Sequence, residues 1–300
     1  MKELKYIRKV AEAFPYEYEQ PPICKVELWD FSRANENDEA RKEAVCLVAS
    51  ISYGNEYCKD PEKLWNLLIE RGHESPFEFV RQYGSYKGET KDWNLREIDF
   101  PTDDVDDDNY DGAFSTCSVN KRVFATFKLK VPIFVARQIQ RHRSFSYMEM
   151  SRRYVKGDKV EFEFWKNKAM RNVTVRDGID TFSYIDLEFI AKCIYVVAVI
   201  DGIKPEQARA FLPLGLYTQF WMQGDYKAWL NFFIHRLHPE AQEETRLVAQ
   251  AMWNLLKEHQ PEIIGTMANY LEEWTKDCNP MFTPARERKA EWFKENFLRV

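Results

Sequence analysis

The feature that most constrains this chain is a strand pattern that runs directly into a dense group of basic residues. Residues 122–136 (RVFATFKLKVPIFVA) alternate and then become continuously apolar, which predicts a central strand with Pro132 at an interruption or at its end. Residues 137–155 (RQIQRHRSFSYMEMSRRYV) follow at once. Like charges at this density repel one another unless an anion neutralises them, so the pattern predicts an anion-binding site beside a buried strand.

The chain as a whole is mildly acidic, which sets this basic group apart. The net charge is −5 over 300 residues, and the calculated pI is about 5.7. Such a protein is not generally attracted to nucleic acid, so a local pocket is favoured over a nucleic-acid surface. With 45% hydrophobic residues the composition is globular, and the length allows one large domain or two small ones.

The cysteines and the start of the chain favour a cytoplasmic location. The six cysteines are scattered without a CxxC pair, and MKELKYIRKV lacks the apolar core of a signal peptide. Reduced thiols in the cytoplasm, or in the host cytoplasm for a viral protein, are the simplest interpretation. Residues 189–200 are the most apolar stretch, but they are too short to span a bilayer and contain Lys192, so no membrane contact is expected.

Two helices are predicted from their capping residues. Asn37 or Asp38 precedes the apolar residues of a helix over 37–52. Asp60 caps a second helix over 60–72, with Pro61 at its first position and Gly72 at its end.

The remaining patterns complete an α+β prediction, with strands gathered in the first half and helices in the second. Strands are expected in the residues after Pro76 and over 159–165. Helices are expected over 181–202, which is apolar enough to be buried, over 204–214, where Pro213 kinks or stops the helix, and over 225–259, split near Pro239.

Residues 84–122 differ from the rest in composition. The segment FPTDDVDDDNYDG carries six aspartates in thirteen residues without periodicity, which is typical of a solvated surface loop. A metal-binding loop is the alternative, but the spacing lacks the glycine and distal glutamate of an EF-hand. No metal site is expected.

The basic group itself suits a phosphorylated ligand. Arginines present planar forks that match phosphate oxygens, and Ser146 and Ser151 add short hydroxyl donors. Two other interpretations remain open at this point. The arginines could lie in solvent or pair with acids such as Asp103–Asp108, or they could form a nucleic-acid contact surface.

The order of these residues narrows the choice. RHRSFSYMEMSRRY (141–154) has Arg-His-Arg, seven residues and then Ser, with Glu two before that Ser and Arg-Tyr two and three after it. This resembles the signature of the flavin-dependent thymidylate synthases, the ThyX family. Further blocks are similar to that family in the same order, over roughly residues 40–250: GHESPFE (72–78), VPIFVARQ (131–138), ARAFLPLGLYTQFW (208–221), LNFFIHR (230–236) and AQEE (241–244).

The resemblance implies a fold and a reaction. The fold would be α+β, with a central twisted, mainly antiparallel sheet flanked by long helices. Residues 1–300 would form one catalytic domain with a core over about 40–250, an insertion over about 84–122 and terminal extensions. The enzyme would be a homotetramer with active sites shared between subunits. It would methylate dUMP to dTMP with 5,10-methylenetetrahydrofolate, FAD and NADPH.

The same resemblance assigns site residues. Arg236 would be catalytic, because it matches the arginine that approaches the uracil, where a fixed cation stabilises negative charge on the ring. The dUMP site would comprise Gln138, Arg141, Glu149, Ser151, Arg152, Arg153, Arg209 and Arg236. The FAD site would comprise Ser52, Ser75, Glu78, Arg141, His142, Arg143, Glu149, Asp225 and Asn231, and the folate and nicotinamide region would include His73 and Tyr154.

Ser151 is assigned a positioning role. It could be called a nucleophile, but a serine nucleophile needs a base within hydrogen-bond reach, and the local pattern identifies none. None of the cysteines lies in a motif of the unrelated thymidylate synthases that use a nucleophilic cysteine.

The chain departs from the family pattern at three positions. Met148, Gly215 and Asp225 each stand where an asparagine is usual, and Asp225 would bring a carboxylate to a flavin-binding position. Met148 and Asp225 motivate one alternative, a divergent flavoenzyme that methylates or hydroxymethylates another pyrimidine nucleotide. A second alternative is a non-enzymatic nucleic-acid-binding protein that uses the arginine cluster.

Overall fold

The computed structural model describes residues 7–13, 23–31, 37–55, 58–80, 124–151, 162–165, 174–177 and 180–298. The acidic segment 84–122, Arg152, Arg153 and Tyr154 lie outside these residues. The strands are β1 (Ile7–Ala13), β2 (Cys24–Asp30), β3 (Phe124–Pro132), β4 (Ser146–Glu149), β5 (Thr174–Asp177), β6 (Asp180–Ser183) and β7 (Tyr217–Asp225). The α-helices are α1 (Asp38–Ser50), α2 (Pro61–Glu70), α3 (Ile133–Ile139), α4 (Tyr184–Ile200), α5 (Pro205–Ala208), α6 (Tyr226–Arg236), α7 (Glu243–His259), α8 (Pro261–Lys276) and α9 (Thr283–Phe293).

Short helical turns link several of these elements. They are η2 (Ile51–Tyr53), η3 (Ser75–Val80), η6 (Arg209–Phe211), η7 (Pro280–Phe282) and η8 (Lys294–Leu298).

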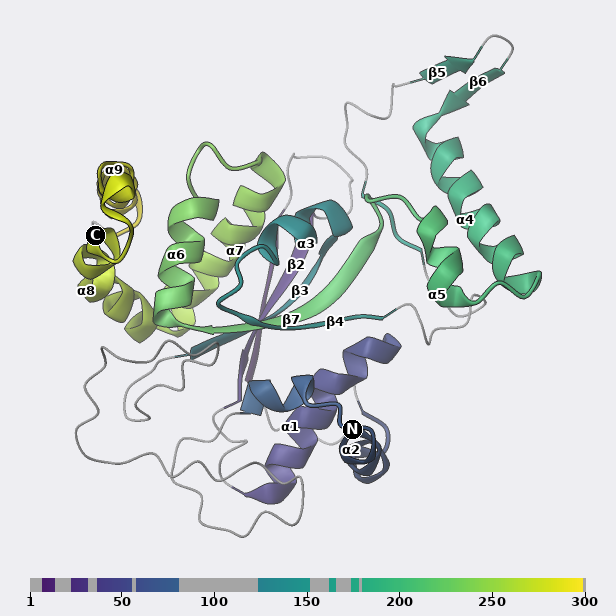
Figure 1. Cartoon of the computed structure of the whole chain (residues 1–300), viewed down its shortest axis with the longest axis horizontal. Coiled ribbons are helices and arrows are strands. Elements are labelled where there is room, and N and C mark those ends of the chain that lie inside the picture. The colour runs from purple at the N-terminus through teal and green to yellow at the C-terminus, as the bar shows by residue number, and fades with distance from the viewer. Residues whose placement is uncertain are drawn as a thin grey trace.

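One antiparallel sheet organises the molecule, in the order β1-β2-β3-β7-β4. Its central strands pair along their full length, with Phe127 opposite Met222, and the short edge strand β4 places Met148 opposite Trp221. β5 and β6 form a separate hairpin. The α+β class and the antiparallel sheet are therefore confirmed, and Figure 1 shows the twist of the sheet.

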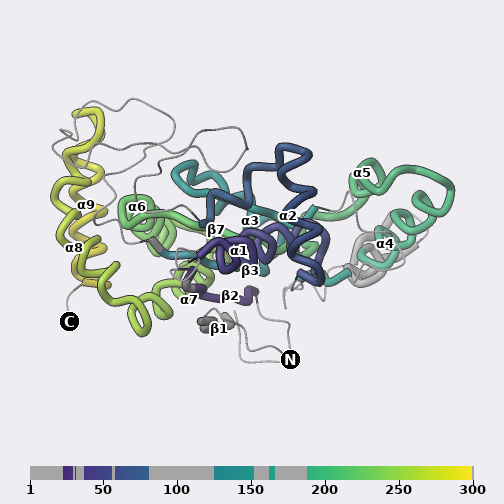
Figure 2. The backbone as a smooth tube through the Cα atoms, turned by 90° about the horizontal axis from the view of Figure 1, so that it is seen from below, coloured from purple at the N-terminus to yellow at the C-terminus, as the bar shows by residue number. Residues whose placement is uncertain are grey.

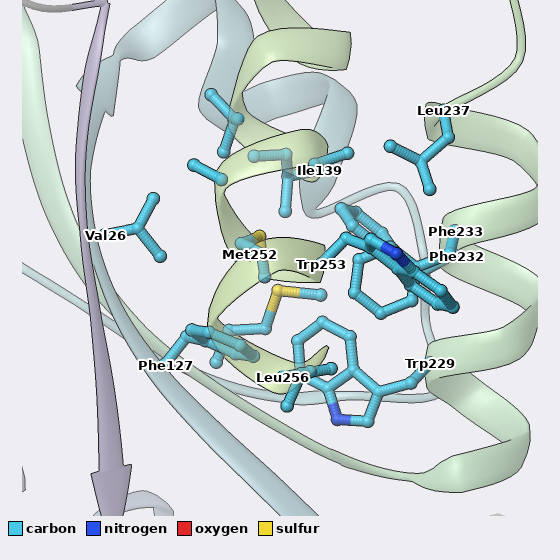
Figure 3. Close-up of a cluster of buried hydrophobic side chains, with 14 of the residues drawn as sticks. Val26, Phe127, Ile139, Trp229, Phe232, Phe233, Leu237, Met252, Trp253 and Leu256 are labelled. Atoms are coloured by element: carbon cyan, nitrogen blue, oxygen red, sulfur yellow. The ribbon is translucent and has the colours of Figure 1, made fainter. Parts of the chain in front are cut away.

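Helices cover both faces of this sheet. α6 and α7 lie on one face, α1 and α2 lie on the other, and α8 and α9 form an outer layer beyond α6 (Figure 1). The larger core fills the space between the sheet and α6 and α7, where Phe127, Trp229, Met252 and Trp253 converge (Figure 3). A second core, which includes Trp29 and Trp221, lies under α1.

The predicted caps of α1 and α2 are confirmed. The Asn37 side chain accepts a hydrogen bond from the Ala40 amide at 2.8 Å, and Asp60 accepts one from the Lys63 amide at 3.0 Å. Gly72 follows α2 with a φ of 63°, a left-handed conformation that glycine adopts without strain. The stop before Pro213 and the break near Pro239 are also found.

The strand predicted after Pro76 is wrong. Residues 75–80 form the 3-10 turn η3, because proline is tolerated in the first turn of a helix and Pro76 starts the turn instead of preceding a strand. The predicted central strand is confirmed as β3, which ends at Pro132, and the apolar residues 133–136 that follow belong to α3. An apolar run alone does not separate a buried strand from a buried helix.

The expected grouping of strands in the first half is confirmed for β1 to β4 but not for β5, β6 and β7. β7 comes from the second half of the chain and pairs with both β3 and β4. Most of its residues are buried on both faces, so it lacks the alternation that marks a half-exposed strand. Of the predicted strand over 159–165, residues 162–165 are described, and Phe164 forms an isolated bridge with Leu216.

α4 forms where a helix was predicted, but its burial was predicted wrongly. Phe189 is 66% exposed, Val197 54% and Ile200 76%. Figure 2 shows α4 and α5 at the opposite end of the molecule from α8 and α9. Among the described residues, no helix combines the length and apolar character needed to cross a membrane.

Candidate functional site

The candidate site begins where β3 passes into α3 and then into β4. The turn between α3 and β4 is anchored by Phe145, whose ring lies edge-on to Trp229 at 4.6 Å. This packing requires the glycine at position 224 of β7, because a Cβ there would lie 2.4 Å from Phe145 Cδ1. The Tyr147 hydroxyl lies 2.8 Å from the His142 carbonyl and 3.0 Å from the Ile139 carbonyl, so it donates back into the same turn.

Arg236 reaches this turn from the last residue of α6. Its Nε donates to His142 Nε2 at 2.8 Å, and its Nη2 donates to the Gln138 carbonyl at 2.9 Å. Both acceptors are uncharged. Within the described part of the chain no carboxylate pairs with Arg236, so its positive charge remains uncompensated.

The electrostatics of the site follow from this arrangement. Burial, then the charge of nearby Arg141, lowers the pKa of Arg236 below its usual value, although a guanidinium remains protonated at neutral pH. Burial, followed by the proximity of Arg236 and His235, lowers the pKa of His142 to about 3. His142 is therefore neutral, and because its Nε2 accepts from Arg236, its proton lies on Nδ1.

Two polar side chains of the predicted dUMP site, Gln138 and Glu149, are held by fixed partners. Gln138 accepts from the Thr245 hydroxyl at 2.9 Å through Oε1, and its Nε2 donates to Gln242. Glu149, on β4, accepts from the Thr218 hydroxyl at 2.7 Å and from Gln140 Nε2 at 3.0 Å. Both side chains are therefore oriented before any ligand is present.

The end of β4 brings two predicted residues together. The Ser151 amide donates to the Ser52 carbonyl at 3.2 Å, although the two serines are far apart in sequence. Met148 points toward the core under α1 and packs against the cluster that contains Trp221. A methionine at this position is thus explained by apolar packing.

The arrangement suits an anionic ligand. Arg137, Arg141 and Arg143 are exposed on or just after α3, and among the described residues none of them forms an ion pair. Together with Arg236 they leave positive charge along one edge of the fold, and phosphate groups supply the complementary charge.

Comparison with known proteins gives the family. The family described as "Thymidylate synthase complementing protein" matches residues 114–262. A flavin-dependent thymidylate synthase of Thermotoga neapolitana is 30% identical over 221 residues, which cover 71% of this chain and 80% of that protein. This chain belongs to the flavin-dependent thymidylate synthase family.

Other relatives match shorter parts. The flavin-dependent thymidylate synthase of Thermus thermophilus is 37% identical over 158 residues, and the match covers 49% of this chain and 57% of that relative. The chain thus spans little more than half the length of that relative. A solved structure titled as a UMP/dUMP methylase PolB from Streptomyces cacaoi bound with 5-Br dUMP aligns at 25% identity and a TM-score of 0.37, covering 48% of this chain and 70% of that one.

The structure brings one group of the predicted family positions together in a single chain. Arg236 contacts Gln138 and His142 directly, Arg141 lies close enough to influence its charge, and Ser52 meets Ser151. η3, which carries Ser75 and Glu78, lies against α1 and β4. His73 is exposed in the turn before η3.

Other predicted positions lie apart from this group. Arg209 is exposed on η6, where its Nε donates to the Glu206 carbonyl at 3.1 Å. Asp225 caps the start of α6 by accepting from the Ala228 amide at 2.9 Å, roughly 16 Å from Arg236 for a helix of this length. The Asn231 side chain accepts from Trp274 Nε1 at 3.3 Å.

Sequence reasoning missed the residues that hold the site in place. Thr218, Thr245 and Tyr147 each fix a predicted residue or its backbone, and Gln242 lay inside the matching AQEE block without being singled out. The contacts of Thr218, Gln242 and Thr245 span 69 to 107 positions, so local spacing carried no signal for them. Tyr147 lies only five residues after His142, inside the basic stretch itself.

Proposed function

We propose that this chain is a flavin-dependent thymidylate synthase that methylates dUMP to dTMP. 5,10-Methylenetetrahydrofolate would supply the carbon and NADPH the reducing equivalents. The observation that carries the proposal is the half-buried guanidinium of Arg236, which is fixed by two neutral acceptors and lacks a carboxylate partner among the described residues. Family membership supports the same reaction.

Arg236 would act on the pyrimidine. A cation held in a fixed position next to the ring stabilises the negative charge that develops on it, and this makes the ring more reactive. The hydrogen bonds to His142 and Gln138 fix the guanidinium without neutralising it. Its remaining N–H groups are then available to the nucleotide.

The rest of the dUMP site would surround this contact. Glu149 and Gln138 are oriented by their own hydrogen bonds and offer polar atoms of fixed direction. The phosphate would be held by cations and short donors of the basic stretch, namely Arg141, Ser151, Arg152 and Arg153. Arg209 would contribute from a neighbouring subunit, because within one chain it lies on η6, which packs against α4 and α5.

The residues present also fit FAD. Arg141 and Arg143 offer exposed guanidinium groups for the pyrophosphate. Ser52 on η2, Ser75 and Glu78 on η3, Asp225 at the end of β7 and Asn231 on α6 would be further contacts. When bound, FAD supplies hydride-transfer chemistry. His142 would orient Arg236 as well as border the flavin, and His73 and Tyr154 would lie in the folate and nicotinamide region.

The apolar face of α4 supports a homotetramer with shared active sites. Phe189, Val197 and Ile200 are exposed, and neighbouring Phe211 is 50% exposed next to Arg209. Such a face is typical of a subunit contact. Val197→Glu should dissociate the tetramer, measured as a fall in mass by light scattering, and Lys204→Glu, a charge change outside this face, should leave it intact. An unchanged mass for Val197→Glu would contradict the assembly.

The decisive experiment compares Arg236→Ala with Arg236→Lys. The alanine protein should retain the flavin absorption band and lose thymidylate formation, because the fixed cation is gone. The lysine protein should retain part of the activity. Assays with dUMP and with dCMP identify the pyrimidine. Near-normal thymidylate formation by Arg236→Ala would refute the catalytic assignment. Methylated product from dCMP alone would show that dCMP, and not dUMP, is the substrate.

A further inference from the structure

The C-terminal helices α8 and α9 pack on α6 at a distance from the basic stretch. They lie almost entirely beyond residues 114–262, the part that matches the family. Figure 1 places them on the outer side of α6, away from β4. Tyr270 of α8 contacts the start of α6, whereas Trp274 contacts Asn231 and His235, closer to the end of α6 that carries Arg236.

Trp274 makes the principal contact from α8. It is 4% exposed, its Nε1–H donates to Asn231 Oδ1 at 3.3 Å, and its ring lies edge-on to His235 at 6.0 Å. Arg286 of α9 stacks over the Trp274 ring at 4.6 Å. The Arg286 Nη1 also donates to the Trp274 carbonyl at 2.6 Å, so α9 fixes the indole in place.

His235 continues the contact toward the site. Its Nδ1 lies 2.8 Å from the Asn231 carbonyl, one turn earlier in α6, and this hydrogen bond sets the direction of the ring. The His235 ring in turn lies edge-on to His142 at 6.3 Å. His142 accepts the hydrogen bond from Arg236 Nε, which closes an unbroken series of contacts from Trp274 to the guanidinium.

We propose that Trp274 is a positioning residue for Arg236, acting through Asn231, His235 and His142. Its consequence for catalysis rests on the proposed function, but the contacts exist independently of it. An ångström-scale displacement of a catalytic group can lower a rate by as much as a hundredfold. The outer helices therefore determine how the guanidinium is presented, through the series of contacts that begins at Trp274.

The test compares two leucine variants in the same helix. Trp274→Leu removes the indole that faces the end of α6. Tyr270→Leu removes an aromatic ring that is 7% exposed and lies edge-on to Tyr226, at the start of α6, at 5.6 Å. Both variants should lower the unfolding temperature and retain the flavin. Only Trp274→Leu should lower kcat for thymidylate formation, by roughly ten- to a hundredfold.

A third variant separates the ring from its hydrogen bond. Trp274→Phe retains an aromatic edge against His235 and loses the donor to Asn231, so we expect kcat between those of the leucine variant and the native protein. The same variant keeps the test decisive if Trp274→Leu does not fold. Native kcat in Trp274→Leu, or an equal loss of kcat in Trp274→Leu and Tyr270→Leu, would overturn the proposal.

A readout without substrate separates this proposal from the proposed function. The chain has five histidines, so the ring signals of isotopically labelled histidine can be assigned with single His→Gln variants. The His142 signal should shift in Trp274→Leu and remain unchanged in Tyr270→Leu. A native protein that forms no thymidylate would refute the proposed function, and the His142 signal would still decide the positioning role.

Discussion

Within the described ranges, basic residues are ion-paired at one end of the fold, on α1, but lack ion-pair partners at the other end, near α3 and the end of α6. At the α1–α2 end, Arg41 is 8% exposed at its side chain and pairs with Asp38 at 2.8 Å, and Lys42 pairs with Glu62. At the α3–α6 end, Arg236 is bound by a histidine and a carbonyl, and Arg141 and Arg143 have no ion-pair partner among the described residues. The charges of the first group are neutralised within the chain, whereas those of the second have no carboxylate partner in the part of the chain that the structure describes.

The presence or absence of an ion-pair partner indicates which cations could bind an anionic ligand. A partly buried cation such as Arg236 opposes folding when it lacks a counter-charge, because neutral hydrogen-bond acceptors replace only part of its hydration. Retaining such a cation beside the exposed cations Arg141 and Arg143 is typical of a functional site. At the α1–α2 end the counter-charge is already built into the chain, so a ligand has nothing to add there.

The largest expected effect comes from supplying the missing counter-charge. His142→Glu would place a carboxylate next to Arg236, and the resulting charge-assisted pair would compete with the nucleotide. We expect kcat/KM for dUMP to fall by roughly a hundredfold. His142→Gln keeps a neutral acceptor and should lose less than about tenfold. Steady-state kinetics at matched flavin content measure both, and equal losses would show that the charge of Arg236 is not the decisive property.

The second prediction concerns stability in mild acid. The pKa of His142 is about 3 in the folded protein against an ordinary 6.5, so below pH 6.5 the unfolded chain takes up a proton that the folded chain does not. The stabilisation is complete above pH 6.5 and is lost as the pH falls toward 3. The slope is about 1.4 kcal/mol per pH unit, or about 2 kcal/mol at pH 5. Burial also lowers the pKa of His235, which adds to the loss.

Urea denaturation between pH 5 and pH 7.5 measures this slope. His142→Gln should flatten the acid side of the profile, because glutamine does not titrate. If a carboxylate faced His142, its pKa would be raised and the slope would have the opposite sign. An unchanged slope in the variant would therefore contradict the neutral histidine on which the comparison depends.

The smallest effect is expected at the paired end. Asp38→Asn removes the carboxylate of the Arg41 pair, but Asp38 is 95% exposed at its side chain, so solvent screening limits the loss to about 0.5–1 kcal/mol. Glu39→Gln is the matched control, because it removes a neighbouring charge from the same first turn of α1. A larger loss in Asp38→Asn than in the control isolates the pair, while dUMP kinetics should not change in either variant.

The parts of the fold that the sequence predicted are those fixed by local chemistry. Asn37 and Asp60 cap their helices, and Gly72 ends α2, because these effects act over one turn. The strand β7 and the turn η3 were not predicted correctly. Buried strands lack alternation, and the turn depends on how Phe79 packs under α1. Neither property is encoded within a few residues.

The same division applies to the site. The motif order named Gln138, His142 and Arg236, but not the bond between His142 and Arg236, which joins residues 94 positions apart. The exposure of α4 was also missed. The sequence pattern of an apolar helix is the same whether residues of its own chain or of another subunit would cover it. Local sequence patterns could therefore not predict contacts that depend on the whole tertiary structure.

Tyr147 has a further consequence for the speed and strength of ligand capture. Its hydroxyl points at the carbonyls of Ile139 and His142, so the loop that carries the Arg-His-Arg sequence is already fastened to the strand that follows it. A loop restrained in this way has less conformational entropy left to lose when a ligand arrives. Tyr147→Phe would remove these hydrogen bonds, so the loop would become ordered only when the ligand binds, and binding would be slower and weaker.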